Sequence, residues 1–595
     1  MNSESSLILM FMEQAKNIGN KPFLWSKKDG AYQTTTWQEA AKIVKNIAYQ
    51  LTELGIKKGD RIVLCAENRT EWVLSNLAVM ASGAIPVPAY TTNTVNDHSH
   101  ILKDSGAKAA IFSNHKILKN LLPAAEGNNG VKFLISIEES SKITNSKIDI
   151  HSWKLLSKST KDKHSLVNKI ISELTRNDIA IIIYTSGTGG VPKGVMLPHR
   201  AIIHNCQGAF DAIQELGLED EVFLSFLLLS HSYEYTAGLW FPIYIGAQIY
   251  FAEGLDQLSK NMGEAQPTIM TAVPRLYELM HAKITKGIKL SGGLKETMFL
   301  KTLELGKKKY HKVKALSLLE VLLDYLLDKI IRGKVRKNFG GRLKVLVSGG
   351  APLNTDIGIF FTALGLNLLQ GYGQTESAPV ISVNRPGKVK METVGTPLLN
   401  TDVKIATDGE ILVRGELLMT GYWNNQEATK NTIKDGWLHT GDIGTIDKNN
   451  FIEITDRKKD IIVNSGGDNL SPQRVEGFLT LEPEILQAMV YGDKKSHIVA
   501  LIIPDKDFLN EWGERTGNDA NIETLDEDKF RKEISAAVER VNNNLSVIEK
   551  VRRFHISFDE FTVENQMITP TLKVRRHKII EKYHSELENL YLNKS

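Results

Sequence analysis

A run of apolar residues leads directly into a loop of hydroxyls, glycines and a single lysine. Residues 179–184 predict a strand, and residues 185–194 have the sequence TSGTGGVPKG. Glycines let backbone amides approach a ligand closely, hydroxyls donate hydrogen bonds, and Lys193 supplies positive charge. The loop therefore suits a polyphosphate. A flexible surface turn is the alternative, but so many specified positions in a row make it the weaker interpretation.

The loop differs from two well-known phosphate signatures. Pro192, Lys193 and Gly194 stand where a Walker A loop requires Gly-Lys-Ser/Thr. Pro192 also takes the place of the third glycine in the dinucleotide fingerprint. The sequence therefore predicts a phosphate site of another kind.

The pattern along the 595 residues predicts an α/β protein of two or more domains. A helix start at 35–39 and short apolar runs at 61–65, 84–88 and 109–112 alternate in the way expected of parallel sheets covered on both faces. The runs at 179–184, 249–251 and 343–347 repeat this pattern. After about residue 395, strands at 403–405, 410–413 and 444–446 predict a small β-rich subdomain.

Composition excludes several classes of protein. Lys and Arg number 73 against 69 Asp and Glu, so nucleic acid is not expected as the main partner. Cys65 and Cys206 form neither a disulfide framework nor a zinc pattern. Residues 1–21 lack the features of a signal peptide, and no apolar run is long enough to cross a bilayer. A cytoplasmic location is therefore the default expectation.

Five further segments follow the phosphate loop in a fixed order: 348–352 (SGGAP), 371–376 (GYGQTE), 437–442 (WLHTGD), 456–460 (DRKKD) and 569–576 (TPTLKVRR). Alone, 371–376 would be an ordinary turn and 456–460 a solvated linker. Together they resemble the adenylate-forming superfamily of acyl-CoA synthetases, luciferases and peptide-synthetase adenylation domains. One position departs, since Gly189 stands where the family usually has Thr.

The resemblance implies an architecture. We expect a large N-terminal adenylation domain of layered α/β sheets at 1–455, which includes the β-rich subdomain at about 395–455. A small, mobile α+β C-terminal domain is expected at 456–595, with its hinge at 456–460.

The resemblance also implies ATP, Mg²⁺ and coenzyme A as ligands and assigns residue roles. Lys573 would be the catalytic lysine, with Lys459 as the hinge pivot and Thr188 and Glu376 as metal ligands. Ser465, Gly466 and Gly467 would face coenzyme A. The expected ATP-binding residues are Thr185, Ser186, Gly187, Thr188, Gly190, Lys193, Gly349, Gly350, Ala351, Gly371, Tyr372, Gly373, Gln374, Thr375, Asp442 and Arg457.

Residues 225–235 (SFLLLSHSYEY) resemble the long-chain fatty acyl-CoA synthetase branch. By that resemblance, His231 orients the substrate carboxylate and joins Thr375 and Glu376 as a catalytic residue. Leu228 and Tyr235 depart from the usual Pro and Arg. The expected function is ATP-dependent ligation of a long-chain fatty acid to coenzyme A.

Three other functions stay open at this point. One is a fatty acyl-AMP ligase that serves a carrier protein, and another is a luciferase-like oxidoreductase. The third is a non-catalytic acyl-binding or membrane-associated homologue. The third is disfavoured because Lys193, Glu376 and Lys573 are all present.

Residues 316–331 predict an apolar helix in which Glu320, Asp324 and Asp328 form one narrow polar stripe. A basic cluster, 307–314, lies just before it. Such a pair could rest on an anionic membrane surface, which would make the protein peripheral at the inner membrane face. A helix docked against the main domain, with the lysines in solvent, is the favoured interpretation.

Overall fold

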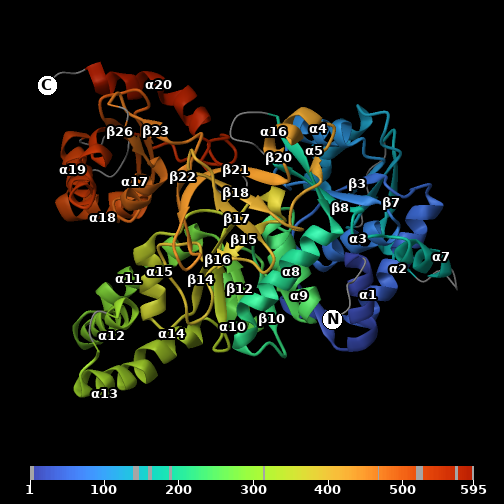
Figure 1. Ribbon diagram of the computed structural model, residues 1–595, viewed down its shortest axis with the longest axis horizontal. Helices are drawn as coiled ribbons and strands as arrows, with labels where there is room; N and C mark the ends of the chain where they lie inside the picture. Colours follow the sequence, from blue (N-terminus) through green and yellow to red (C-terminus); the bar gives the residue numbers. More distant parts are fainter. Residues whose placement is uncertain are drawn as a thin grey trace.

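The computed structural model describes residues 6–138, 146–158, 164–185, 191–312, 315–466, 468–517, 527–569 and 574–592 (Figure 1). It has the expected α/β architecture, with several sheets and their helices in the N-terminal part and a smaller α+β body at the C-terminal end. Within the described ranges, no helix is long and apolar enough to cross a membrane.

The first large sheet is parallel throughout, as the fully apolar runs predicted. Helix α2 (Trp37–Glu53) precedes the sheet, and α3, α4 and α5 connect its strands. As expected, a Thr caps the start of α2, where Thr36 and Glu39 form a reciprocal capping box. The strand order is β4-β3-β5-β6-β7. The bounds are β3 Arg61–Cys65, β4 Ile85–Pro88, β5 Ala109–Phe112, β6 Phe133–Ser136 and β7 Asp149–Ser152, with α3 Thr70–Ala81, α4 Val95–Ser105 and α5 His115–Glu126.

The second large sheet has nine strands in the order β16-β15-β14-β13-β12-β10-β11-β1-β2. Its outer strands are β1 Pro22–Lys28, β2 Ala31–Thr36, β15 Val380–Val383 and β16 Thr396–Pro397. Its central strands are parallel, and β13 and β14 are neighbours, so the segments at 348–352 and 371–376 lie at the same edge. The runs predicted at 249–251 and 343–347 are β11 and β13. The central bounds are β10 Val222–Ser225, β11 Gln248–Phe251, β12 Ile269–Ala272, β13 Val345–Ser348 and β14 Leu368–Gly373.

The strand before the phosphate loop corrects one expectation. β8 (Ile179–Thr185) is not part of a parallel sheet but pairs antiparallel with β9 (Lys193–Pro198), which in turn pairs with β19 (Gly421–Tyr422). The reason is burial. Alternate side chains of β8 enter two different apolar clusters, so both faces are buried without a parallel neighbour.

The strands predicted after about residue 395 are present and belong to one antiparallel sheet. This sheet contains β17 Asp402–Ile405, β18 Glu410–Arg414, β20 Ile433–Lys434, β21 Trp437–Ile446 and β22 Ile452–Arg457. The strands predicted at 403–405, 410–413 and 444–446 lie in β17, β18 and β21. Asp456 and Arg457 end β22, and the chain then turns at 458–460.

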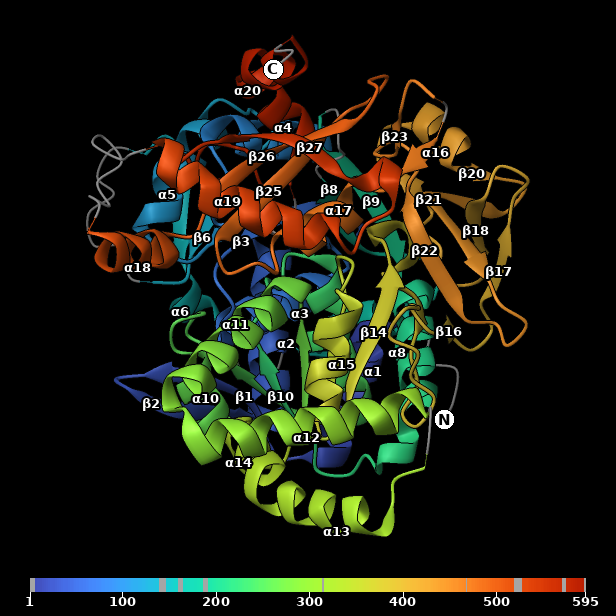
Figure 2. The ribbon, with the colours of Figure 1, turned by 90° about the vertical axis from the view of Figure 1, so that its left-hand side faces the viewer.

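The C-terminal body forms its own sheet (Figure 2). Its buried apolar residues form two clusters. Its strands are β25 Ile485–Tyr491, β26 Ile498–Pro504 and β27 Val551–Ile556, and its helices include α17 Pro472–Leu479, α18 Lys506–Thr516, α19 Glu527–Asn542 and α20 Arg576–Leu592. Polar contacts tie it to α11 (Pro274–Ser291), including an ion pair of 2.6 Å between Lys286 and Glu511. The domain boundary at 456–460 stays a prediction.

The segment predicted as one helix at 316–331 is α13 (Leu318–Leu327) followed by a π-helical turn, η3 (Asp328–Arg332). It packs against α12 (Gly293–His311) and is followed by α14 (Gly333–Asn338). In two views at right angles, α13 lies at the lower extreme of the molecule (Figures 1 and 2).

The face of α13 that packs inward is the acidic stripe. Asp324 and Arg332 form an ion pair of 2.8 Å with both side chains 5% exposed, and Lys309 also binds Asp324. Glu320 pairs with Lys308 at 2.9 Å, and Asp328 pairs with Arg336 at 2.8 Å. Burial acts to raise the pKa of Asp324, but the hydrogen bonds from Lys309 and Arg332 outweigh it and lower that pKa. The helix is docked as expected, but by its polar side, and its leucines are exposed.

We expect Asp324→Asn to destabilise this helical segment by roughly 3 kcal/mol, because the substitution removes the buried counter-charge nearest to the Arg332 guanidinium and leaves Asp328 at 3.8 Å. Hydrogen exchange of residues 318–332 should become markedly faster. Asp328→Asn is the matched control, since Asp328 is 41% exposed and an exposed pair contributes less than about 1 kcal/mol. Equal exchange rates in the two variants would contradict the importance of the buried pair.

Candidate active site

The carboxyl ends of β13 and β14 place two predicted segments beside each other. After β13, Gly349 lies against Tyr233, and a Cβ at Gly349 would be 3.0 Å from the tyrosine ring. The Tyr233 hydroxyl donates to the Val347 carbonyl at 2.9 Å, which fixes the ring there. Gly350 follows with φ +83°, and Ala351 is exposed beyond it. The close approach explains why 348–352 needs its glycines.

Gly373 ends β14 in an even tighter position. A Cβ there would lie 1.7 Å from the Pro379 carbonyl oxygen, so no larger residue fits. Gly371 is half-buried beside the Ser382 carbonyl, 3.3 Å from where its Cβ would be. The Gln374 amide donates to Ser377 Oγ at 3.2 Å and begins the short turn η4 (Thr375–Ser377). The turn presents Thr375 and Glu376 at the edge of the sheet.

Three predicted residues meet at the junction with the β-rich subdomain. The Tyr372 hydroxyl donates to Asp442 Oδ2 at 2.6 Å, and Arg457 Nε donates to Asp442 Oδ1 at 2.9 Å. Asp442 and Arg457 are directly opposite on β21 and β22. Burial raises the pKa of Tyr372 well above its ordinary value, and the Asp442 charge adds to this, so the phenol stays a donor. Each carboxylate oxygen retains lone pairs for ligand hydroxyls.

Lys193 and Glu376 meet around an aromatic ring that sequence analysis missed. Lys193 Nζ lies 5.0 Å from the centroid of Tyr422, and the Tyr422 hydroxyl donates to Glu376 Oε1 at 2.8 Å. Tyr422 is on β19, which pairs with β9. Nothing in the sequence around Tyr422 marks it, because its place follows only from the pairing of these strands. Thr185 pairs opposite Lys193 at the loop end of the hairpin.

The arrangement around Glu376 fits a Mg²⁺ ion of the kind held by one carboxylate and substrate phosphates. Glu376 is half-buried, with one oxygen bound by Tyr422. In the described part of the chain, no three His, Cys, Asp or Glu residues are grouped as a metal cage. Of the two residues predicted to bind the metal, Glu376 lies in the described residues and Thr188 lies outside them.

A hydrogen bond joins the segment at 225–235 to the Thr375 turn. The hydroxyl oxygens of Ser232 and Thr375 lie 3.0 Å apart, and both side chains are buried. The neighbouring His231 is half-buried, and its Nδ1 accepts from the Tyr233 amide at 3.3 Å. This contact brings the residues expected to hold a carboxylate next to those expected to hold a phosphate.

Glu234 is a second residue that sequence analysis missed. It begins the π-helix η2 (Glu234–Trp240) and is fully buried, with Oε2 accepting from the Thr271 hydroxyl at 2.8 Å. Gly238 makes room for it, because a Cβ there would lie 2.3 Å from the carboxylate. Burial raises the pKa of Glu234 to about 7, against the opposing effect of its hydrogen bonds. The carboxyl group therefore titrates near neutral pH.

Of the two departures in this segment, Tyr235 has a structural explanation and Leu228 has none. The Leu228 carbonyl accepts from the His231 amide at 2.9 Å, but a prolyl carbonyl would accept equally well. Tyr235 is fully buried between Trp72 and Trp240, with its hydroxyl donating to Asn76 Oδ1 at 3.2 Å. This apolar setting suits a neutral phenol, whereas a guanidinium would lose its hydration there.

Glu410 is a third residue missed from the sequence. Its carboxylate accepts from the Gly441 amide at 2.8 Å and from Lys458 at 3.3 Å, and lies 3.3 Å from His439. Burial acts to raise its pKa, but these hydrogen bonds outweigh it and the pKa is lowered. Glu410 thus holds the segment 439–441, next to Asp442, against the turn after β22.

Several predicted residues are not brought to this site. Ser465 and Gly466 are exposed in a loop of the C-terminal body, where the Ser465 amide donates to the Lys495 carbonyl at 2.9 Å. Lys459 is exposed in the turn after β22. The remaining positions, Ser186, Gly187, Thr188, Gly190, Gly467 and Lys573, lie outside the described residues.

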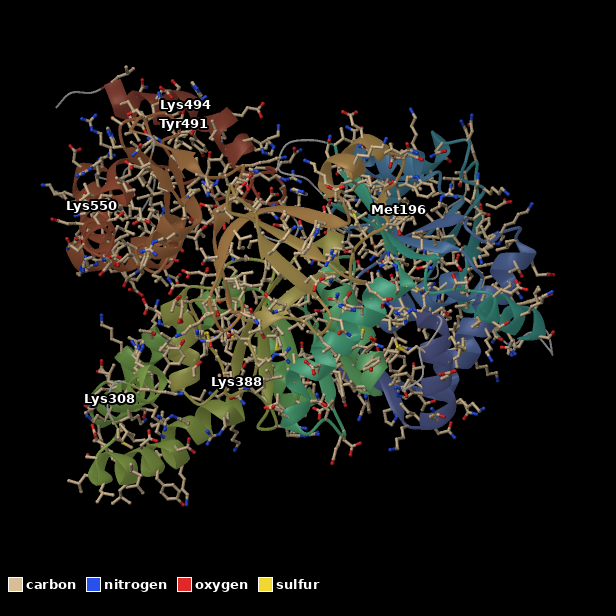
Figure 3. The ribbon with its side chains drawn as sticks, viewed as in Figure 1. Met196, Lys308, Lys388, Tyr491, Lys494 and Lys550 are labelled. Carbon is tan, nitrogen blue, oxygen red and sulfur yellow. The ribbon has the colours of Figure 1, made fainter. Side chains whose placement is uncertain are left out.

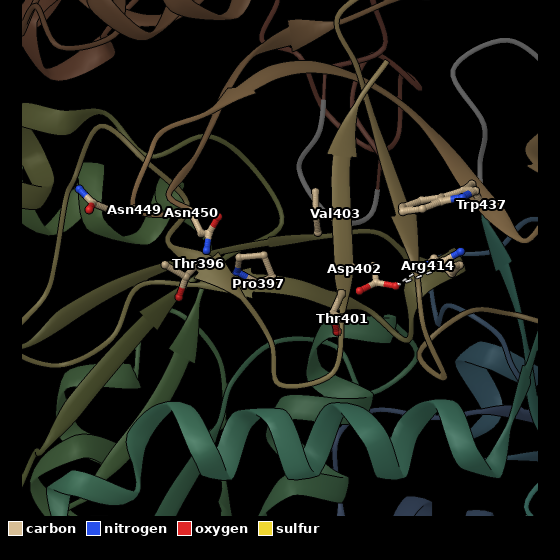
Figure 4. Close-up of a pocket in the computed structure, with 9 residues that line it drawn as sticks. All are labelled: Thr396, Pro397, Thr401, Asp402, Val403, Arg414, Trp437, Asn449 and Asn450. Carbon is tan, nitrogen blue, oxygen red and sulfur yellow. Dashed lines mark hydrogen bonds and ion pairs between the residues drawn. The ribbon is translucent and has the colours of Figure 1, made fainter. Parts of the chain in front are cut away.

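A separate hollow of about 710 Å³ lies in the β-rich subdomain (Figure 4). Trp437 is at one side of it, flanked by Lys404 and Arg414 at 4.0 and 4.5 Å from its ring. None of the lining residues belongs to the predicted ligand-binding set. The lining residues are Thr396, Pro397, Thr401, Asp402, Val403, Arg414, Trp437, Asn449 and Asn450.

Comparison with known families gives two matches that together span most of the chain. Residues 11–423 match the family described as AMP-binding enzyme. Residues 459–595 match the AMP-binding enzyme C-terminal domain.

Curated relatives align over nearly the full length. The long-chain-fatty-acid–CoA ligase FadD15 of Mycobacterium tuberculosis is 31% identical, over 95% of this chain and 93% of that protein. Long chain acyl-CoA synthetase 3 of Arabidopsis thaliana is 29% identical, over 98% of this chain and 91% of that protein.

A solved structure has the same fold. The A domain of carboxylic acid reductase from Segniliparus rugosus, in complex with AMP and a co-purified carboxylic acid, aligns with a TM-score of 0.76 at 19% identity. The alignment covers 100% of this chain and 95% of that one.

We expect Glu234→Gln to change how stability depends on pH. Because the folded-state pKa of Glu234 is raised from 4.5 to about 7, the wild-type protein loses stability as pH rises through that interval, by up to about 3 kcal/mol. Gln does not ionise, so the variant should match the wild type near pH 5 and exceed it near pH 8. Thermal unfolding across this range measures the difference. A constant offset between the two proteins would contradict the raised pKa.

Proposed function

The chain belongs to the family of AMP-binding enzymes, and on that basis we propose that it is an ATP-dependent ligase that joins a long-chain fatty acid to coenzyme A. Its adenylate-forming, acid–thiol ligase chemistry follows from membership of the family. The long-chain substrate is the finer part of the proposal. It is supported by residues 225–235 and by the substrates that the names of both curated relatives give.

The hydrogen bond between Ser232 and Thr375 is the observation on which the proposal depends most. An acyl-adenylate forms where a carboxylate oxygen meets the α-phosphate. The 225–235 segment is proposed to hold the carboxylate through His231, and Thr375 is proposed to bind the phosphate. The 3.0 Å contact supports the proposal, because with these roles the two halves of the reacting bond would lie within reach of each other.

In the proposed first half-reaction, a carboxylate oxygen attacks the α-phosphorus in line and pyrophosphate leaves. Asp442 and Arg457 would hold the ribose and Tyr372 would offer a face to adenine. Negative charge builds on the phosphoryl oxygens, so positioned cations and hydroxyls, from Lys193, Thr375 and Lys573, would stabilise it. A Mg²⁺ ion bound through Glu376 would neutralise part of the phosphate charge.

In the proposed second half-reaction, the coenzyme A thiol attacks the acyl carbonyl and AMP leaves. A thiol pKa of about 8.5 gives a usable thiolate fraction near neutral pH. Rotation of the C-terminal domain about Lys459 would withdraw Lys573 and bring Ser465, Gly466 and Gly467 to the site. Phosphate is a far better leaving group than oxide, which is why the acid is first joined to AMP.

We predict that the protein, given ATP, Mg²⁺, coenzyme A and a panel of carboxylic acids, makes a set of acyl-CoA products centred on long chains. Mass spectrometry of the products measures this directly. Acyl-adenylate that accumulates without any CoA ester would move the protein to the acyl-AMP ligases. Products only from short or aromatic acids would contradict the fatty-acid assignment.

We also predict that Lys573→Ala lowers the rate of adenylation at least about a hundredfold, because a cation is lost where charge develops. Thioester formation from a supplied acyl-adenylate should stay within a few-fold of the wild type. Lys578→Ala is the matched control, since the Lys578 side chain is 38% exposed on α20 and pairs with Glu581. Loss of both half-reactions to the same degree would reject this division of labour.

A further inference from the structure

The helix α13 is amphipathic in the reverse of the usual sense. A surface helix of a globular protein normally buries its apolar side and exposes its charges. Here Asp324 is 4% exposed, whereas Leu318 is 90% and Leu319 80% exposed. We call the exposed side of this segment the leucine face. It consists of Leu318, Leu319, Val321, Leu322, Leu323, Tyr325, Leu326 and Ile330.

This orientation is held by charge. Each acid of the inner stripe has a cationic partner from α12, η3 or α14, and the Asp324–Arg332 pair is buried. Arg332 also donates to the Ala363 carbonyl at 2.8 Å and the Thr302 carbonyl at 3.2 Å. If the helix rotated to bury its leucines, the acids of the inner stripe would turn toward solvent. The buried Arg332 would then lose its ion pair with Asp324. The leucine face therefore stays outward.

The surroundings of the leucine face are strongly cationic. Between residues 274 and 338 there are sixteen Lys and Arg against six Asp and Glu, whereas the whole chain has an excess of only four. Five of those six acids are already in ion pairs within the segment. Lys329 Nζ lies 4.6 Å from the ring centroid of Tyr325, which is itself on the leucine face. Lys308 on α12, next to α13, is labelled in Figure 3.

We propose that the leucine face is a docking surface for the headgroup region of an anionic lipid bilayer. The leucines would enter the acyl boundary, and lysines such as Lys312, Lys329 and Lys334, all exposed, would meet lipid phosphates. A helix of ten residues is too short to span a bilayer but long enough to lie in its interface. Its position at the extreme of the molecule lets a flat surface reach it (Figures 1 and 2).

Charge favours this occupant over a second copy of the chain. Joining two leucine faces would bring two cationic segments together, and these would repel each other. A bilayer supplies both the apolar layer and the compensating negative charge. The inward acids matter here as well, because acids on the outer face would repel anionic lipid.

The test is flotation of the full-length protein with vesicles of phosphatidylcholine containing about one-third phosphatidylglycerol. The wild type should float with them, and less so with phosphatidylcholine alone or in high salt. Leu319→Glu/Leu322→Glu should lower the bound fraction at least about tenfold, because two inserted side chains become charged. The matched control is Leu155→Glu/Leu166→Glu, which changes exposed leucines on α6 (Trp153–Leu156) and α7 (His164–Ser172).

A site-specific probe makes the result independent of bulk binding. Cys65 and Cys206 are both buried, so an environment-sensitive fluorophore on Leu322→Cys would label the leucine face selectively. Its emission should shift to the blue when anionic vesicles are added, while the same label on Leu155→Cys should not respond.

Three results would overturn the proposal: no flotation of the wild type, equal flotation of the α13 double variant, or no emission shift at residue 322. A dimer that dissociates in the double variant, with vesicle binding unchanged, would assign the face to a second copy. Binding to vesicles does not depend on catalysis, so its failure and a failure of the proposed activity are distinguishable.

Discussion

The carboxylate of Asp442 is the contact on which the geometry of this site depends. It receives a hydrogen bond from Tyr372, at the end of the central parallel sheet, and another from Arg457, on the last strand of the β-rich subdomain. One buried anion therefore fixes the sheet edge against the subdomain. Glu410 stabilises the arrangement, because its carboxylate accepts a hydrogen bond from the backbone amide of Gly441, next to Asp442. Asp442 lies on β21, and its carboxylate binds one side chain from β14 and one from β22, so it joins three strands.

Local sequence was sufficient for most of the fold. Fully apolar runs marked the parallel strands, and Thr36 with Glu39 marked the start of α2, because both signals arise from short-range physics. The expected nucleotide residues Tyr372, Asp442 and Arg457 do meet, and Lys193 lies near Glu376 through Tyr422. The roles assigned to these residues, and the domain boundary, remain predictions.

The features that sequence analysis missed depend on contacts between residues far apart in the chain. β8 has the composition of a strand in a parallel sheet, yet it is one arm of an antiparallel hairpin that is buried on both sides. Tyr422 and Glu410 belong to no motif, and Glu234 lies in the segment 225–235 without an expected role, because each of the three matters only through a partner distant in the chain or across a strand. The periodicity of α13 correctly gave two faces but could not say which one packs, because that depends on Arg332 and Lys309.

The reversed helix has an evolutionary consequence. Its exposed leucines contribute little to folding, since they are in water, so drift toward polar residues would cost the native state almost nothing. Purifying selection for stability acts instead on the inner acids and their cationic partners. If the outer positions nevertheless stay aliphatic among close orthologues, the selective pressure must come from something outside the folded chain. Substitution rates on the two sides of α13 therefore separate what the polypeptide needs to fold from what the cell needs it to touch.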